Sequence, residues 1–517
     1  MKKWIMTLPP VMAAISCGQE ARQAEPAGQD GPQRPNVVII VADDLGFGDV
    51  SCYGRQTMPT PCLDSMARGG LLFNHAYATS ATSSPSRYAL FTGMYPWRAD
   101  MHILPGDAPL MIPVDMPTMP KMFQGLGYRT AAIGKWHLGM GDGHTDWNQE
   151  IVPAANTVGF DYTNIIPATV DRVPTVYVEN GRVVGLDPED PIRVRYTKPF
   201  PGEITGREHP ELMKMPFHHG HDGTIINGIP RIGHMMGGTT ALWDDATMAD
   251  YFYERAEAFV DAHQDEPFFL YYGLHQPHVP RTASAAYAGS TPYGPRGDVI
   301  AEADGLVGRM MRHLEALNLL DNTLVIFTSD NGAVVQDGYE DGADTLLGEH
   351  DPNGGLRGGK YSLFDGGTHV PFIAYWKGHI QPGVSDAWFT QLDLYASLAA
   401  LVGGDVPAGL DTENQLPVLL GQSRNGRRSQ VIEAMGRLGY MQDGYALLPP
   451  YKGPERNETG IELGNLKEFA LYNLAEDVHQ DHDLSREEPR RLRRLRKAFL
   501  KATAGFYQPA VEEEKLQ

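Results

Sequence analysis

The stretch NVVIIVA at residues 36–42 carries the clearest fold signal in the chain. Its unbroken apolar run is typical of a central strand that is covered on both faces. Similar runs recur at 129–133, 267–274, 323–328 and 369–376, with helical patterns at 241–263 and 298–317 between them. The alternation predicts an α/β domain with a large, mainly parallel central sheet flanked by helices.

Oxygen-bearing side chains follow two of these runs. Asp43 and Asp44 come directly after the first run, and Asp330 and Asn331 come just after the run at 323–328. Sites in such sheets gather beyond the carboxyl ends of the strands, so we expect these four side chains to meet. They offer the hard oxygen ligands that suit Ca²⁺ or Mg²⁺.

The segment Ser83-Ser84-Pro85-Ser86-Arg87 predicts the start of a helix. Pro85 suits the first helical position, and Thr92-Gly93 predicts the end. A serine here caps free backbone N–H groups, but a helix start with Arg87 on its first turn also suits an anion.

Three glycine- or proline-bearing loops add cations. They contain Lys135 and His137, His275 and His278, and Lys360. Each residue alone is more typical of a surface or a loop. Together they predict a pocket that holds the oxygens of an anion.

These motifs, in this order, resemble the type I, formylglycine-dependent sulfatases of the alkaline phosphatase superfamily. The family signature is Cys or Ser, any residue, then Pro-Ser-Arg and a later Thr-Gly, and this chain has Ser83 to Arg87 followed by Thr92-Gly93. The resemblance runs from about residue 36 to 401, with a weaker echo at 471–474. It implies an alkaline phosphatase-like fold and a sulfuric ester hydrolase.

The resemblance also implies residue roles. Ser83 would be oxidised to formylglycine, whose hydrate attacks sulfur and later expels sulfate. Ca²⁺ would be bound by that side chain together with Asp43, Asp44, Asp330 and Asn331. His278 would protonate the leaving alcohol, His137 would take the second hydroxyl proton, and Arg87, Lys135 and Lys360 would hold the formylglycine and the sulfate oxygens.

Some positions depart from the family pattern. Serine at position 83, where cysteine is commoner, implies an anaerobic-type sulfatase-maturing enzyme as partner. His369 stands near the place of an arginine in many relatives, and we expect it to change a structural contact only. His275 is a rival to His278 as the acid, and the Pro-His-x-Pro context favours His278.

The expected substrate is a sulfated carbohydrate, with Gal or GalNAc as the favoured sugar. Residues 168–172 and 220–223 resemble stretches in sulfatases of gut Bacteroidetes that act on glycans. Asp171, Arg172 and His221 are therefore candidates for sugar contacts, or they pin the insertion in which they lie. Two rival functions stay open: a phosphomonoesterase or phosphodiesterase that uses Ser83 directly, and a non-catalytic lipoprotein that binds sulfated glycans.

The N-terminal residues predict export. Residues 1–17 have a basic start, a short apolar stretch and small residues before Cys17, which is typical of a bacterial lipoprotein signal; an ordinary signal peptide is the alternative. Residues 18–34 read as a linker. We expect a periplasmic or cell-surface lipoprotein whose contact with the membrane is confined to this anchor.

The remaining chain divides into a catalytic domain at 35–406 and a smaller α+β subdomain at 407–517. An insertion is expected at about 142–238, where periodicity is weak. The basic run at 490–497 is predicted to be a solvated helix face. Beyond Cys17, Cys52 and Cys62 either pair or stay as two thiols.

Composition excludes one class of partner. The chain has 517 residues, of which 43 are Lys or Arg and 64 are Asp or Glu, so its formal net charge is −21. Nucleic-acid binding draws on clustered cations, and this balance argues against it. An anion site must therefore be locally basic.

Overall fold

The computed structural model describes residues 34–54 and 57–508. The predicted signal with Cys17, and the linker up to residue 33, lie outside the described residues. Among the described residues, no helix is both long and apolar enough to cross a membrane.

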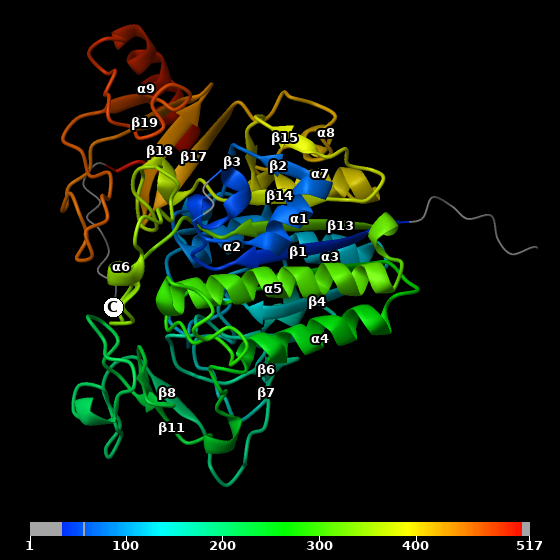
Figure 1. The fold of residues 1–517 in the computed structure, drawn as a ribbon, viewed down its shortest axis with the longest axis vertical. Coiled ribbons are helices and arrows are strands. Elements are labelled where there is room, and N and C mark those ends of the chain that lie inside the picture. Colours follow the sequence, from blue (N-terminus) through cyan, green and yellow to red (C-terminus); the bar gives the residue numbers. More distant parts are fainter. Residues whose placement is uncertain (1–33, 55–56, 509–517) are drawn as a thin grey trace, which may run out of the picture. The chain divides into compact units, whose positions relative to one another are not determined.

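A ten-stranded mixed sheet forms the centre of the fold (Figure 1). Its order is β15-β2-β14-β13-β1-β12-β4-β5-β6-β7, and the five strands from β13 to β5 are parallel. The bounds are β15 Gly383–Ser385, β2 Leu71–Phe73, β14 Phe372–Tyr375, β13 Thr323–Ser329, β1 Asn36–Ala42, β12 Phe268–Gly273, β4 Arg129–Lys135, β5 Tyr162–Ile166, β6 Val178–Glu179 and β7 Arg182–Val183. The predicted parallel centre is confirmed, whereas the run at 369–376 forms β14, which is antiparallel to β13 and to β2.

Helices cover both faces of the sheet. Val38 and Ile40 of β1 pack with α1, α4 and α5, while Val37, Ile39 and Val41 pack with α2, α3 and α7. This is the alternation that a strand buried on both faces requires. The helix bounds are α1 Pro61–Gly69, α2 Ser83–Thr92, α3 Met119–Gly125, α4 Met248–Ala262, α5 Gly294–Ala316 and α7 Leu394–Val402.

Both long helices that the pattern predicts are present with shifted starts. The helix predicted from residue 241 begins at Met248, because the Asp244 carboxylate accepts a hydrogen bond from Ala246 N in a turn before it. The helix predicted from residue 298 begins at Gly294, with Pro295 in its first turn.

A separate antiparallel sheet lies toward the C-terminus and is covered by a helix. Its strands are β17 Ser429–Ala434, β18 Arg437–Gln442, β19 Tyr445–Leu448 and β20 Ala470–Asn473, and the helix is α9 Pro489–Thr503. The smaller α+β part is thus present. The sequence pattern predicts strands at about 429–433 and 469–473 and a helix over 485–502, so β18 and β19 were missed, and the helix begins at Pro489 instead of residue 485. The boundary at 406/407 stays a prediction.

The remaining elements are short. Within 142–238, β5 to β7 extend the central sheet, and two small ribbons pair β8 with β11 and β9 with β10. The bounds are β8 Arg193–Arg195, β9 Ile225–Ile226, β10 Ile229–Pro230, β11 His234–Met236, β3 Ala76–Tyr77, β16 Phe389–Thr390, α6 Ala343–Leu346 and α8 Leu416–Leu419.

Register brings the strand ends together. Ala42 of β1 is level with Ser329 of β13, and Gly273 of β12 is level with Gly134 of β4. The residues that follow β1 and β13, and the last residue of β4, therefore emerge at one edge of the sheet.

Candidate active site

A pocket opens at this edge of the sheet. Its lining comes from several separate parts of the chain: Ser83, Ile103, His137, Asp171, Arg172, His219, Gly220, His221, Ile232, His278, Asp337, Lys360 and Tyr361. Seven of the predicted site residues line it directly. The other six, Asp43, Asp44, Arg87, Lys135, Asp330 and Asn331, are buried and linked to the lining by hydrogen bonds or ion pairs.

The floor consists of Ser83 and those six buried residues. The rim consists of Asp171, Arg172 and His221. The three remaining predicted residues, His137, His278 and Lys360, lie in the pocket lining with both.

Ser83 is the first residue of α2 and is 4% exposed. The prediction that the helix begins at Pro85 is wrong by two residues, since Thr82 is the N-cap. Proline is tolerated there because the first-turn N–H groups have no partner within the helix. Ser83 Oγ accepts a hydrogen bond from Lys135 Nζ at 2.5 Å.

His137 faces Ser83. Its Nε2 donates to the carbonyl of Leu104 at 2.9 Å, so in the neutral ring Nδ1 is the acceptor, 3.3 Å from Ser83 Oγ. Burial lowers the pKa of His137 well below its usual value, and Lys135 and Arg172 lower it further. The ring is therefore a neutral base pointed at the Ser83 side chain.

Two cations of the floor, Lys135 and Arg87, pair with two of its three carboxylates. Lys135 Nζ lies 2.6 Å from Asp43 Oδ1, and the Arg87 guanidinium contacts Asp330 Oδ2 through Nε at 2.9 Å and Nη2 at 2.8 Å. Burial would raise the pKa of Asp330, but Arg87 and Lys135 outweigh it and hold that pKa below its usual value. For Asp43, burial prevails over Lys135 and raises the pKa to about 6. Arg87 also contacts the hydroxyl of Tyr271.

Lys360 joins the floor to a carboxylate that sequence reasoning missed. Its Nζ lies 2.8 Å from Asp44 Oδ2 and 2.7 Å from Asp337 Oδ2, and Tyr361 donates its hydroxyl to Asp337 Oδ1 at 2.9 Å. Burial would raise the pKa of Asp337, but Lys360 outweighs it and brings that pKa to about 2. The only sequence signal for Asp337 was its place in the loop that follows Asp330 and Asn331.

The floor fits a hard divalent cation. Ligand atoms of Asp43, Asp44 and His278 lie within 4.8 Å of one another. Asp43 Oδ2 and Asn331 Oδ1 are buried oxygens without a hydrogen-bond partner, while Asn331 Nδ2 donates to Asp44 Oδ1 at 2.8 Å. Buried oxygens without partners are costly unless a ligand satisfies them, and oxygen donors are what Ca²⁺ prefers.

His278 and His275 lie in different surroundings. His278 lines the pocket and its Nδ1 is bound to the carbonyl of Val279 at 2.6 Å, which leaves Nε2 on the side of Asp44, 3.7 Å from Oδ2. His275 is buried outside the lining, and burial lowers its pKa to about 4. This geometry favours His278 as the group that meets a ligand.

The rim residues hold one another and also face the pocket. His221 Nε2 lies 2.9 Å from Asp171 Oδ2, and Arg172 Nη1 lies 3.1 Å from Asp171 Oδ1. Burial opposes ionisation of Asp171, but Arg172 and nearby histidines outweigh it and hold its pKa well below the usual value. Both alternatives for the rim, sugar contacts and pins of the insertion, agree with this arrangement.

Two further expectations concern residues outside the pocket. His369 Nδ1 lies 2.8 Å from Asp365 Oδ2 and its Nε2 lies 2.7 Å from the carbonyl of Asn74, so its contacts are structural, as expected. Cys52 and Cys62 are both free thiols, so the alternative without a disulfide holds in this structure.

Comparison with known proteins gives consistent matches. The family model described as Sulfatase matches residues 35–404. An N-acetylgalactosamine-6-O-sulfatase of Bacteroides thetaiotaomicron is 45% identical over 494 residues, which is 94% of this chain and 96% of that protein. Human arylsulfatase A is 33% identical over 410 residues, covering 78% of this chain and 71% of that protein.

A solved structure also matches this chain over most of its length. It comes from work titled for the metabolism of multiple glycosaminoglycans by Bacteroides thetaiotaomicron, and it superposes with a TM-score of 0.90 at 45% identity. The match covers 91% of this chain and all of that one. At this level of identity and coverage, the likeness extends well beyond the central sheet.

Proposed function

The chain belongs to the sulfatase family and hydrolyses a sulfate ester, and we propose that its substrate is a 6-O-sulfated sugar of galactose configuration, above all N-acetylgalactosamine 6-sulfate. The observation that carries this proposal is the 45% identity to an N-acetylgalactosamine-6-O-sulfatase over 94% of the chain. That span includes the residues of the floor and the insertion that supplies the rim. Similarity confined to the floor would support sulfatase chemistry without supporting a sugar.

We infer that Ser83 is converted to formylglycine before the enzyme works. Formylglycine, when formed and hydrated by one water molecule, would supply two geminal hydroxyls, one as nucleophile and one that restores the aldehyde when its proton leaves. Lys135 Nζ, 2.5 Å from Ser83 Oγ, orients the oxygen at this position and balances its charge. His137 Nδ1 faces the same oxygen and accepts its proton, since the ring is held neutral.

The floor is proposed to hold Ca²⁺ through Asp43, Asp44, Asp330, Asn331 and the modified side chain at position 83. The bound cation would supply charge that polarises the sulfuryl oxygens. The unpartnered oxygens of Asp43 and Asn331 support this assignment. Arg87 keeps Asp330 ionised and in place, since its guanidinium contacts that carboxylate twice.

His278 and Lys360 are proposed to act on the ester itself. His278, in its protonated form, would donate the Nε2 proton to the sugar oxygen as the S–O bond breaks, because Nδ1 is already engaged with Val279. Lys360 would hold a sulfate oxygen, with Asp337 and Asp44 fixing its ammonium group.

Maturation and location are further parts of the proposal. A serine at position 83 calls for an anaerobic-type sulfatase-maturing enzyme, which this chain does not encode. The N-terminal residues support export as a lipoprotein anchored at Cys17, in the periplasm or at the cell surface.

A desulfation screen tests the substrate proposal. Protein produced with a maturing enzyme is offered N-acetylgalactosamine 6-sulfate, galactose 6-sulfate, N-acetylglucosamine 6-sulfate and N-acetylgalactosamine 4-sulfate, and released sulfate is measured. We expect kcat/KM to be about 100-fold higher for the first two, because a polar site rejects a misplaced hydroxyl strongly. A preference for the 4-sulfate or for the gluco sugar would contradict the proposal, and two zinc ions per chain would favour the phosphoesterase rival.

A further inference from the structure

Helix α9 carries an unusual concentration of positive charge. Between Pro489 and Thr503 it has seven Lys or Arg residues and no acidic residue, in a chain of net charge −21. Among the six that are exposed, five fall within about 100° of arc at the helical period. They are Arg490, Arg493, Arg494, Lys497 and Lys501, and we call them the basic strip.

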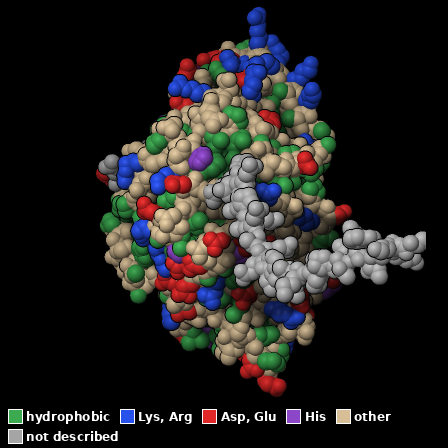
Figure 2. Space-filling model, turned by 90° about the vertical axis from the view of Figure 1, so that its right-hand side faces the viewer, with side chains coloured by type: hydrophobic (Ala, Val, Ile, Leu, Met, Phe, Trp, Pro, Cys, Tyr) green, Lys and Arg blue, Asp and Glu red, His purple; other side chains and the backbone are tan. Residues whose placement is uncertain are grey.

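The opposite face of α9 is already used for packing. Leu495 and Phe499 are fully buried against the C-terminal sheet, in a cluster with Val431, Tyr440 and Leu447. Of the large apolar side chains of α9, Leu500 is exposed, and a single leucine is too little for a bilayer-binding stripe. The basic strip is exposed to solvent. Figure 2 shows Lys and Arg side chains gathered at the top of the molecule, where Figure 1 places α9.

Most of the strip has no carboxylate partner. Within the described part of the chain, Arg494 is 4.0 Å from Asp443, whereas Arg490, Arg493, Lys497 and Lys501 form no ion pair. Two other cations of α9 are engaged, because Arg491 pairs with Glu488 and Arg496 lies over the ring of Phe469. Among the described residues, these four cations have no carboxylate partner and are exposed to an external anion.

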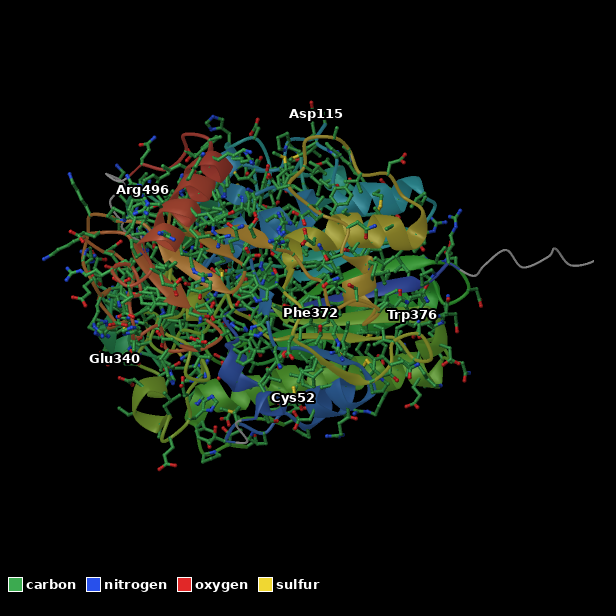
Figure 3. The ribbon with its side chains drawn as sticks, turned by 90° about the horizontal axis from the view of Figure 1, so that it is seen from above. Cys52, Asp115, Glu340, Phe372, Trp376 and Arg496 are labelled. Atoms are coloured by element: carbon green, nitrogen blue, oxygen red, sulfur yellow. The ribbon has the colours of Figure 1, made fainter. Side chains whose placement is uncertain are left out.

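The strip has the dimensions and position to hold a polyanion. Eleven residues separate its ends, which is about 16 Å along the helix axis. Arg496 on α9 and Glu340, which follows the pocket residue Asp337 by three positions, lie toward the same side of the molecule, opposite Trp376 (Figure 3), with α9 above α6 along the longest axis (Figure 1). A polymer bound on the strip is thus held on the side of the molecule where the pocket lies, while the rest of the acidic surface repels it.

We propose that the basic strip of α9 binds a linear sulfated polysaccharide and retains it on the side of the molecule where the pocket lies. The inference rests on the proposed function for the chemistry of the ligand, and it adds a site that recognises the polymer instead of the single sulfated sugar. The sequence pattern alone predicts only that the basic face of α9 is solvated. The packing of its apolar side against the C-terminal sheet, together with the cations that have no ion-pair partner among the described residues, points to a ligand.

The test replaces four cations of the strip with glutamine: Arg490→Gln, Arg493→Gln, Lys497→Gln and Lys501→Gln. Glutamine keeps helix propensity, so α9 should still form. A matched control removes four exposed cations elsewhere: Arg68→Gln, Lys198→Gln, Lys377→Gln and Arg424→Gln. Binding of fluorescent chondroitin 6-sulfate chains is measured at low and high salt, beside sulfate release from a monosaccharide substrate.

We expect the strip variant to bind the polymer roughly tenfold more weakly at low salt, with the control unchanged and the difference lost at high salt. Turnover of the monosaccharide should stay at the wild-type level in both variants. Equal loss in both variants, or unchanged polymer binding in the strip variant, would overturn the proposal. The proposal would also be overturned if the strip variant lost binding to anionic phospholipid vesicles but kept its binding to the polymer. That result would assign the strip to a membrane surface. Because binding is read directly, a failure of the proposed 6-sulfate specificity would appear separately, in the monosaccharide assay.

Discussion

The floor and the rim of the pocket are built in different ways. The floor residues leave the ends of β1, β4 and β13 and the first turn of α2, so the register of the parallel strands fixes their positions. The rim residues come from the insertion, where backbone bridges such as Arg172 with Ile232 replace long strands. A frame of strand ends suits chemistry that every substrate needs, whereas loops can change with the sugar.

Replacing the floor serine should give the largest effect. Ser83→Ala removes the proposed precursor of the nucleophile, and we expect kcat to fall by at least about 1,000-fold. Ser84→Ala is the matched control, since Ser84 Oγ only accepts a hydrogen bond from Leu104 N at 3.3 Å. Sulfate release is measured for both variants, each produced with the same maturing enzyme. An active Ser83→Ala protein would show that the nucleophile does not come from Ser83.

Removing the proposed divalent cation should give the second-largest effect on activity. Chelation is expected to lower activity by about 100-fold or more and to lower the melting temperature, because a ligand that binds the native state stabilises it. Added Ca²⁺ should restore both. Full activity in protein shown by elemental analysis to be free of metal would contradict the assignment of the floor carboxylates.

A buried network behind the floor allows a stability test. Asp49 is paired with Arg296 at 2.7 and 2.6 Å and with His350 at 2.8 Å, and it accepts a hydrogen bond from Gly46 in the loop after Asp44. Asp49→Asn leaves the buried Arg296 without its charge partner, so we expect a loss of about 3–5 kcal/mol in chemical denaturation. Asp250→Asn, in an exposed pair with Arg309, should cost about 0–1 kcal/mol.

The same network predicts a pH dependence. Burial would raise the pKa of Asp49, but Arg296 and His350 outweigh it and lower it from 3.8 to about 2. A lowered carboxyl pKa stabilises the fold above about pH 4, and this contribution is lost as the pH falls from about 4 to about 2. Asp49→Asn should lack that part of the acid transition; an unchanged profile would show that the pairing does not stabilise the native state.

The rim should give the smallest effect, and one that depends on the substrate. His221→Gln is expected to lower kcat/KM for a 6-sulfated sugar by about 10- to 100-fold, since a lost polar contact costs about 1–3 kcal/mol. Turnover of an aryl sulfate, which has no sugar ring, should change much less. If kcat/KM falls for both substrates and the melting temperature falls as well, the rim residues hold the insertion in place and do not contact the sugar.

Much of the floor could be predicted from sequence because its motifs directly follow strong strand patterns. Asp337 could not, since its pairing with Lys360 depends on how the loop between them folds. The start of α2 was misplaced because Pro85 suits the first helical position, yet Thr82 is the cap. The β18–β19 hairpin was missed although Asp443-Gly444 between them is a two-residue turn signal, because glycine and polar residues interrupt the apolar pattern.

We propose that Ser83 is only the precursor of the working nucleophile. Mass spectrometry of the peptide that contains Ser83, taken from active enzyme of the native host, can test this. We expect a residue lighter than serine by two hydrogens, in a fraction that rises with specific activity. Unmodified serine throughout fully active enzyme would contradict it.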